Sequence, residues 1–115
     1  LFHPSFAGVS LGLLHGAQAD ALVMCHEPTR SHMRGLPHYQ LPDLAACMQA
    51  NLAAARLTNP NARFVGIAVN TAALDDAQAA TLCAELSAEH GLPCQDPVRM
   101  GCDAIIERLQ ADFGT

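Results

Sequence analysis

Lysine and tryptophan are both missing from this sequence, and aromatic residues make up only 4% of its 115 positions. The formal net charge is −5, and six arginines carry the permanent positive charge of the side chains. Surfaces that bind nucleic acid or anionic membranes are rich in lysine and arginine, so we expect neither partner. No basic leader followed by an apolar stretch opens the sequence, and no apolar run reaches the ~18 residues that a membrane-spanning helix requires.

Cysteine is present but follows no recognisable pattern. The five cysteines form no CxxC motif, and an odd number cannot pair completely within one chain. Without an export signal, we expect reduced and mostly buried cysteines in a cytoplasmic protein. They are Cys25, Cys47, Cys83, Cys94 and Cys102.

The apolar residues, half of the total, alternate between helix-like and strand-like spacing. The runs DALVMCH and RFVGIAV are typical of strands buried on both faces. Asp75 and Asp76 place acidic charge at the start of a helix, and Gly91 ends it. We expect helices at 5–15, 42–57, 75–90 and 102–113, and strands at 20–26, 63–69 and 92–95.

This order of elements predicts an α/β fold, a three-layer sandwich around a parallel sheet. Three strands make a thin sheet, and the sequence opens at Leu1 without an initiator Met. We therefore expect residues 1–115 to be the C-terminal part of a longer domain, and the exposed sheet edge to favour homo-oligomerisation. Gly8, Gly12 and Gly16 either form a smooth helical stripe for close packing or are unrelated.

Polar residues gather in the segments that follow the expected strands. HEPTRSHMRGLPH follows the first strand, NTAAL the second and QDPVRMG the third. Ligands of open parallel sheets bind beyond the carboxyl ends of the strands, where these segments lie. We expect residues 27–41 to be a connection without secondary structure, and such long connections favour function over a merely solvated loop.

The first of these segments carries the candidates for binding and proton transfer. The planar forks of Arg30 and Arg34 suit carboxylates or phosphates. Histidine titrates near neutrality, so the histidines and the acid of this segment are candidates for proton transfer: His26, Glu27, His32 and His38. The spacing of Cys25 and these histidines matches no zinc signature, so we predict no metal.

The other two segments each contribute one candidate. Asn70 follows a buried strand, where it either hydrogen-bonds a nucleotide or substrate or ties down the turn at Thr71. Arg99 is a third cation for a phosphate-bearing ligand or a surface residue. No GxxxxGK[ST] phosphate loop, GxSxG or HExxH motif occurs, so the sequence supports neither a nucleophile-based hydrolase nor a triphosphate cradle of its own.

Four stretches together resemble a known family: HPSFAGVSLGLLHGAQADALVMCHEPTRSHMRGLPHY, NLAAARLTNP, VGIAVNT and GLPCQDPVRMG. They are similar to the C-terminal P-loop-type domain of a bacterial and archaeal family long catalogued as a domain of unknown function, which includes D-glutamate N-acetyltransferase. The resemblance covers nearly all of the chain. It implies that an N-terminal Rossmann-like domain and a phosphate loop lie upstream, and that residues 26–34 belong to the distinctive motif of the family.

The resemblance implies acetyl transfer from acetyl-CoA to the amino group of an acidic amino acid, D-glutamate in the first place. The amine must lose a proton before attack, which His26, Glu27 or His32 would accept. Arg30 and Arg34, with His38 beside them, would bind the small-molecule substrate.

The strand that ends in Asn70 is similar to one in dethiobiotin synthetase-like enzymes, where the asparagine helps to hold adenine. Asn70 and Arg99 would accordingly face the cofactor, acetyl-CoA or possibly ATP. The alternatives are an ATP-dependent ligase or kinase that acts on a carboxylate, and a nucleotide-binding module without turnover.

Overall fold

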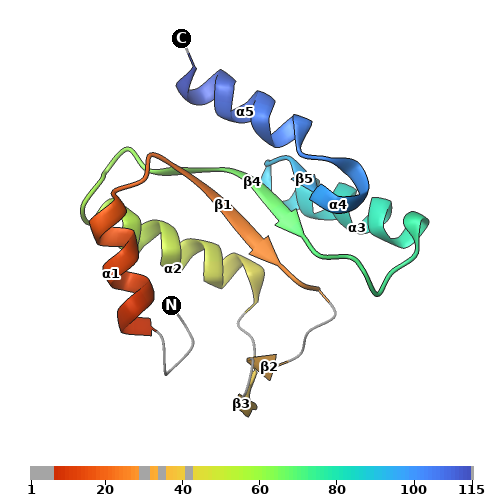
Figure 1. Ribbon diagram of the computed structural model, residues 1–115, viewed down its shortest axis with the longest axis horizontal. Helices are drawn as coiled ribbons and strands as arrows, with labels where there is room; N and C mark the ends of the chain where they lie inside the picture. Colours follow the sequence, from red (N-terminus) through yellow and green to blue (C-terminus); the bar gives the residue numbers. More distant parts are fainter. Residues whose placement is uncertain (1–6, 29–31, 34–35, 41–42, 115) are drawn as a thin grey trace. The chain divides into compact units, whose positions relative to one another are not determined.

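The computed structural model describes residues 7–28, 32–33, 36–40 and 43–114 (Figure 1). Its elements are α1 (Ala7–Ala17), β1 (Ala21–His26), β2 (His32–Met33), β3 (Leu36–Gln40), α2 (Leu44–Arg56), β4 (Arg63–Val69), α3 (Asp76–His90), β5 (Cys94–Gln95), α4 (Pro97–Met100) and α5 (Asp103–Phe113). The chain consists of two compact units. Leu1–Asp20 and Arg30–Arg63 form the first, here called the helix-pair unit, and Ala21–Thr29 and Phe64–Thr115 form the second, here called the sheet unit.

The sheet unit contains a parallel sheet of three strands in the order β1-β4-β5. β4 pairs with β5 in parallel, with Ile67 opposite Cys94. β1 and β4 run in the same direction (Figure 1), and the backbone N–H of Asn70 donates to the carbonyl of His26 at 2.8 Å where the two strands end. The α/β fold with a parallel sheet is therefore confirmed, and the carboxyl ends of its strands meet at one edge.

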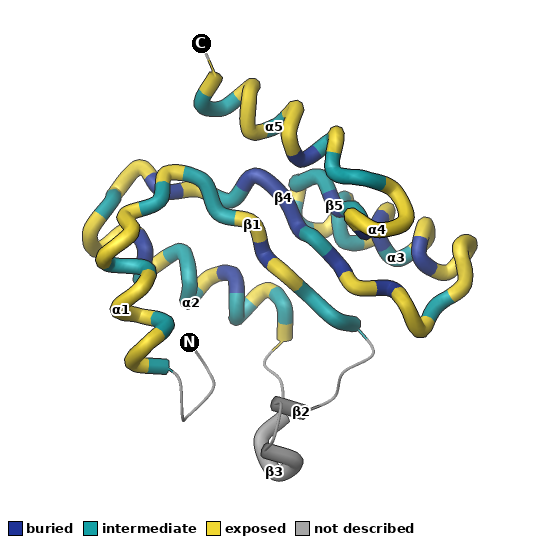
Figure 2. Tube along the Cα trace, viewed as in Figure 1, coloured by how far each residue is buried: buried dark blue, intermediate teal, exposed yellow. Residues whose placement is uncertain are grey.

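The core of the sheet unit is built on β4, the central strand. Val65, Ile67 and Val69 are at most 2% exposed, as expected for an apolar run with neighbours on both sides (Figure 2). Gly66, between two of them, lets α5 approach the strand closely. A Cβ atom at Gly66 would lie 2.7 Å from Cγ1 of Ile105, so the absence of a side chain here is a packing requirement.

Helix α3 begins and ends at the residues that the sequence indicates. The side chain of Asp75 accepts from the backbone N–H of Gln78, and the side chain of Gln78 accepts from the backbone N–H of Asp75, which completes a capping box. Gly91 adopts the left-handed conformation, with φ of 65°, and ends the helix. The helix buries Ala79 and Cys83.

The cysteines of the sheet unit behave as thiols rather than as disulfides. All five cysteines of the chain are free, and Cys83 and Cys94 are buried. Burial and the neighbouring Cys83 raise the pKa of Cys94 to about 12, so this thiol stays protonated at neutral pH. Cys25, by contrast, is exposed on β1.

In the helix-pair unit, α1 and α2 are joined by side-chain contacts. Nε2 of His15 lies 3.0 Å from the carbonyl oxygen of Ala54. Asn59, which follows α2, donates to the backbone carbonyls of Gln18 and Ala19 at 3.1 and 3.2 Å. These bonds hold the residues that directly follow α1. No helix among the described residues is long and apolar enough to span a bilayer.

One expectation about local structure is wrong, and one short helix was not predicted. Residues 27–41 are not a connection without secondary structure, because β2 and β3 pair as an antiparallel hairpin within them. Pro37 in the sequence argues against a strand, but a two-stranded hairpin has only edges, where proline is tolerated. The four-residue helix α4 was not expected either, although Asp96 followed by Pro97 is a typical helix start.

The glycine stripe of α1 has no partner among the described residues. A Cβ atom added at Gly8, Gly12 or Gly16 would have no atom within 4 Å among the parts of the chain described above. The interpretation of a close-packing stripe therefore has no support within the described chain.

Replacing Gly66 by Ala should destabilise the protein, because the new methyl group would overlap the side chain of Ile105. We expect the free energy of unfolding to fall by about 1–3 kcal/mol, the usual cost of overpacking a core. Urea unfolding of the full-length protein measures this. The matched control is Gly12→Ala, on an open helical face, which should be neutral or stabilising by up to about 1 kcal/mol. Equal stability of Gly66→Ala and wild type would contradict the packing requirement.

Candidate functional site

The carboxyl edge of the sheet unit brings together the residues that end its three strands. His26 ends β1, Asn70 follows β4 and Asp96 follows β5. The hydrogen bond from Asn70 N to His26 O ties the first two ends together. Ligands of open parallel sheets bind beyond the carboxyl ends of the strands, so this carboxyl edge is the candidate site.

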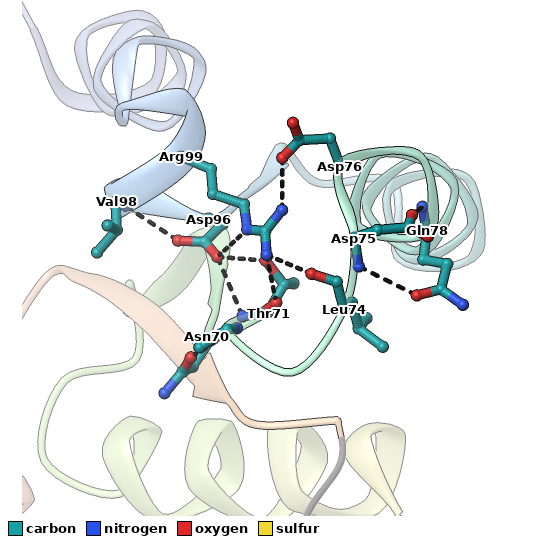
Figure 3. Close-up of polar contacts among 10 residues, drawn as sticks. Asn70, Thr71, Leu74, Asp75, Asp76, Gln78, Asp96, Val98 and Arg99 are labelled. Atoms are coloured by element: carbon teal, nitrogen blue, oxygen red, sulfur yellow. Dashed lines mark hydrogen bonds and ion pairs between the residues drawn. The ribbon is translucent and has the colours of Figure 1, made fainter.

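A buried polar pair joins the ends of β4 and β5. Thr71 and Asp96 are 0% and 3% exposed. Oδ2 of Asp96 accepts from the backbone N–H of Thr71 at 3.0 Å and also from the Thr71 hydroxyl (Figure 3). Its other oxygen accepts from the backbone N–H of Val98 at 3.0 Å, which caps α4. One carboxylate therefore fixes the residue after β4 and starts the next helix.

The pKa of Asp96 lies below its ordinary value. The hydrogen bond from the Thr71 hydroxyl is the largest cause, and the backbone N–H groups of Thr71, Val98 and Arg99 act in the same direction. Burial raises the pKa, but by less than the hydrogen bonds lower it. Asp96 is therefore an anion at neutral pH, although it is almost fully buried.

Arg99 is held by the turn that it faces. Its Nη1 lies 2.5 Å from Oδ1 of Asp76, and its Nη2 donates to the backbone carbonyls of Thr71, at 3.0 Å, and Leu74 (Figure 3). Nε lies 3.9 Å from Oδ2 of Asp96. The Arg99 side chain is 24% exposed, whereas the side chain of Asp76 is 99% exposed, so their ion pair lies at the surface of the sheet unit.

Asn70 presents a fixed amide at the carboxyl edge. Its Oδ1 accepts from the backbone N–H of Ala72 at 3.1 Å, which defines the orientation of the amide group. The residue is exposed, and its side chain points away from the group around Arg99 (Figure 3). Among the described residues, the Asn70 NH2 group donates no hydrogen bond. The turn-forming interpretation of Asn70 is thus observed, and its donor group faces outward.

His26 is half-buried at the end of β1, and burial lowers its pKa from the ordinary value of 6.5. The imidazole is therefore neutral at neutral pH, the form that accepts a proton. Glu27 follows it and is also half-buried.

Four further predicted residues come from the segment 30–38. Arg30 and Arg34 lie outside the described residues. His32 and His38 belong to the β2–β3 hairpin, whose backbone alone is described, and this hairpin is part of the helix-pair unit. In the described chain, no group of three or more His, Cys, Asp or Glu side chains is arranged to hold a metal ion.

Two residues of this edge, Thr71 and Asp76, and the capping role of Asp96 were not predicted from the sequence. An available signal was Asp96 before Pro97, since aspartate at the position before a helical proline is a typical N-cap. The polar Thr71 directly after a buried strand was a second one, because a buried hydroxyl needs a partner.

The fold is an α/β domain with a parallel sheet, and the family that the chain matches is described as a P-loop domain. Residues 1–106 match a family described as "Domain of unknown function (DUF1611_C) P-loop domain". The chain belongs to this family. A crystal structure of a DUF1611 family protein from Anabaena variabilis is similar, with a TM-score of 0.84 and 34% sequence identity over 96% of this chain and 33% of that one.

Two curated relatives carry the same name. A D-glutamate N-acetyltransferase from Pseudoalteromonas sp is 52% identical over 109 residues, which are 95% of this chain and 33% of the relative. A D-glutamate N-acetyltransferase from Tritonibacter scottomollicae is 44% identical over 111 residues, which are 96% of this chain and 33% of the relative. The chain thus spans about a third of the length of these relatives.

Replacing Thr71 by Val should lower the free energy of unfolding by about 1–3 kcal/mol at pH 7, because a buried carboxylate loses a donor. The pKa of Asp96 is depressed in the folded state, so this stabilisation is complete above the ordinary value of 3.8 and is lost as the pH falls below it toward the lowered value. Urea unfolding of the full-length protein from pH 7 to pH 3 should therefore show a shrinking difference from wild type.

The control for this variant is Thr81→Val, at an exposed position on α3, which should change stability by no more than about 0.5 kcal/mol. A Thr71→Val protein as stable as wild type at pH 7 would mean that the Thr71 hydroxyl does not stabilise the carboxylate.

Proposed function

We propose that the full-length protein transfers the acetyl group of acetyl-CoA to the amino group of D-glutamate. The observation that carries this proposal is the 52% identity, over 95% of this chain, to a protein named D-glutamate N-acetyltransferase. The matched region is 95% of this chain, and the carboxyl ends of its parallel strands are where such sheets bind ligands.

The first requirement of the reaction is a base that removes a proton from the substrate ammonium group. An ammonium nitrogen has no lone pair, so a proton must leave before the nitrogen attacks the thioester carbonyl. Attack forms the C–N bond, the C–S bond breaks, and the CoA thiolate departs. His26 is the first candidate for the base because its lowered pKa keeps it neutral at neutral pH. Glu27 and His32 are the other candidates.

The substrate carries two carboxylates, which require cationic or hydrogen-bonding partners. In this proposal Arg30 and Arg34 bind them, with His38 beside them. The cofactor lies toward Asn70 and Arg99. The outward-facing NH2 group of Asn70 supports this assignment, because it donates to no described residue and can donate to acceptor atoms of a nucleotide. A contact from Arg99 to a phosphate would compete with its ion pair to Asp76. The proposal further includes a homo-oligomer and a phosphate loop upstream of this chain.

A second candidate function follows from the description of the family as a P-loop domain. P-loops typically bind nucleoside triphosphates, so the full-length protein would then be an ATP-dependent ligase or kinase that acts on a carboxylate. A nucleotide-binding module without turnover is the third possibility.

The deciding experiment incubates the full-length protein with acetyl-CoA and a panel of D- and L-amino acids. We expect release of CoA thiol and an acetylated product by mass spectrometry with D-glutamate, and little with L-glutamate or neutral amino acids. ADP formation that depends on the amino acid would instead support a ligase or kinase. Binding of CoA or ATP without product over hours would support the module without turnover.

The role of His26 can be tested through the pH profile. If neutral His26 is the base, kcat/KM should fall on the acid side with an apparent pKa below 6.5, because burial favours the neutral form. His26→Gln should lower kcat by about 10²–10⁴-fold and remove this acid limb. The control is His90→Gln, at the C-terminal end of α3, which should leave both unchanged. An acid limb that persists in His26→Gln would assign the base to another residue.

A further inference from the structure

The turn at residues 70–74 is held by more interactions than its length requires. The backbone N–H groups of Asn70, Thr71, Ala72 and Leu74 all donate hydrogen bonds within the sheet unit: to His26 O, Asp96 Oδ2, Asn70 Oδ1 and Thr71 O respectively. A five-residue turn with four bonded N–H groups has little freedom left. Such rigidity is what a binding site needs when it presents one side chain to a ligand.

Arg99 accounts for the carbonyl side of the same turn. Its Nη2 donates to the backbone carbonyls of Thr71, near the start of the turn, and Leu74, at its end. Its Nη1 at the same time pairs with Asp76 at 2.5 Å, in the first turn of α3. One planar guanidinium therefore joins α4, the turn and the start of α3, a geometry that needs several donors fixed in one plane.

The anchors of this arrangement are buried, while the group that it presents is exposed. Thr71 and Asp96 are 0% and 3% exposed, whereas Asn70, directly before Thr71, is exposed. Oδ1 of Asn70 is committed to Ala72, so the amide cannot rotate to exchange its oxygen and nitrogen without losing that bond. The network thus fixes both the position of Asn70 and the direction of its NH2 donor.

We propose that Arg99 is a positioning residue for the acyl donor: together with Asp76 and the Thr71–Asp96 pair, it holds turn 70–74 so that the Asn70 amide meets the nucleotide part of acetyl-CoA. This inference rests on the proposed function and specifies how Arg99 serves the cofactor. The guanidinium acts through the turn and does not neutralise a phosphate. Its two carbonyl contacts and its ion pair leave it committed to the protein.

The test compares three acyl donors in the full-length protein: acetyl-CoA, its 3′-dephospho form and acetyl-pantetheine, which lacks the nucleotide. Arg99→Met keeps much of the side-chain stem and removes the fork. It should raise KM for both nucleotide-containing donors by the same factor, about tenfold to a hundredfold, with kcat little changed. With acetyl-pantetheine, the variant and the wild type should be equal.

Coupling between residues separates positioning from direct binding. Asn70→Ala should raise KM for acetyl-CoA by a similar factor, and Arg99→Met should add little on that background, because both changes remove the same contact. Arg99→Lys should not restore the wild-type KM, since a single ammonium cannot reach two carbonyls and Asp76 together. The control Arg108→Met, which breaks an ion pair to Asp112 on α5, should leave KM unchanged.

Three results would overturn the inference. One is a KM increase for acetyl-CoA that disappears with the dephospho donor, which would assign Arg99 to a phosphate. Another is full additivity of Asn70→Ala and Arg99→Met. The third is unchanged amide hydrogen exchange of residues 70–74 in Arg99→Met, where we expect exchange at least tenfold faster.

Failure of the proposed function gives a different pattern from failure of this inference. If the wild-type protein does not turn over acetyl-CoA at all, the proposed function is wrong, and the hydrogen-exchange comparison still decides whether Arg99 holds the turn. If the wild type turns over acetyl-CoA and the exchange is unchanged, the proposed function stands and the positioning role is wrong.

Discussion

The Asp96 carboxylate is the constraint on which the carboxyl edge depends. It is almost fully buried and charged, and it remains so because the Thr71 hydroxyl and several backbone N–H groups donate to it. A buried charge is tolerated only when its hydrogen bonds are complete. The end of β4, the start of α4 and, through Arg99, the start of α3 are therefore arranged around one anion. The site at this edge has its shape because the Asp96 carboxylate needs hydrogen-bond donors from the surrounding chain.

Much of the sheet unit was predictable because its signals are local. The runs DALVMCH and RFVGIAV are apolar enough to be central strands, and β1 and β4 occupy them within one residue. Asp75 starts α3 because its side chain caps the helix, and Gly91 ends α3 because it adopts the left-handed conformation. In these cases propensity, pattern and capping agree, so reasoning from the sequence is sufficient.

The site itself was only partly predictable, because its partners lie far apart in the chain. Of the two interpretations of Asn70, the one in which it ties down the turn is observed, and His26 ends its strand at the edge as expected. The partner of Arg99, Asp76, is 23 residues away, and Asp96 is 25 residues from Thr71. No local pattern encodes such pairs, since they arise only when the parallel sheet places successive strand ends side by side. The β2–β3 hairpin was not predicted for another reason. β2 has only two residues, which are too few to show the alternation of apolar and polar residues that indicates a strand.

The division of the chain has a topological consequence for how this protein is made and altered. The chain passes from one unit to the other at residues 20–21, 29–30 and 63–64. Neither unit is a continuous segment, so no single cleavage releases one of them, and neither is transferable as a cassette to another protein. β1 and β4 are neighbours in the sheet but are separated by residues 27–62, so their pairing is non-local. During synthesis β1 must wait for its central partner, and such delayed pairing makes folding slow.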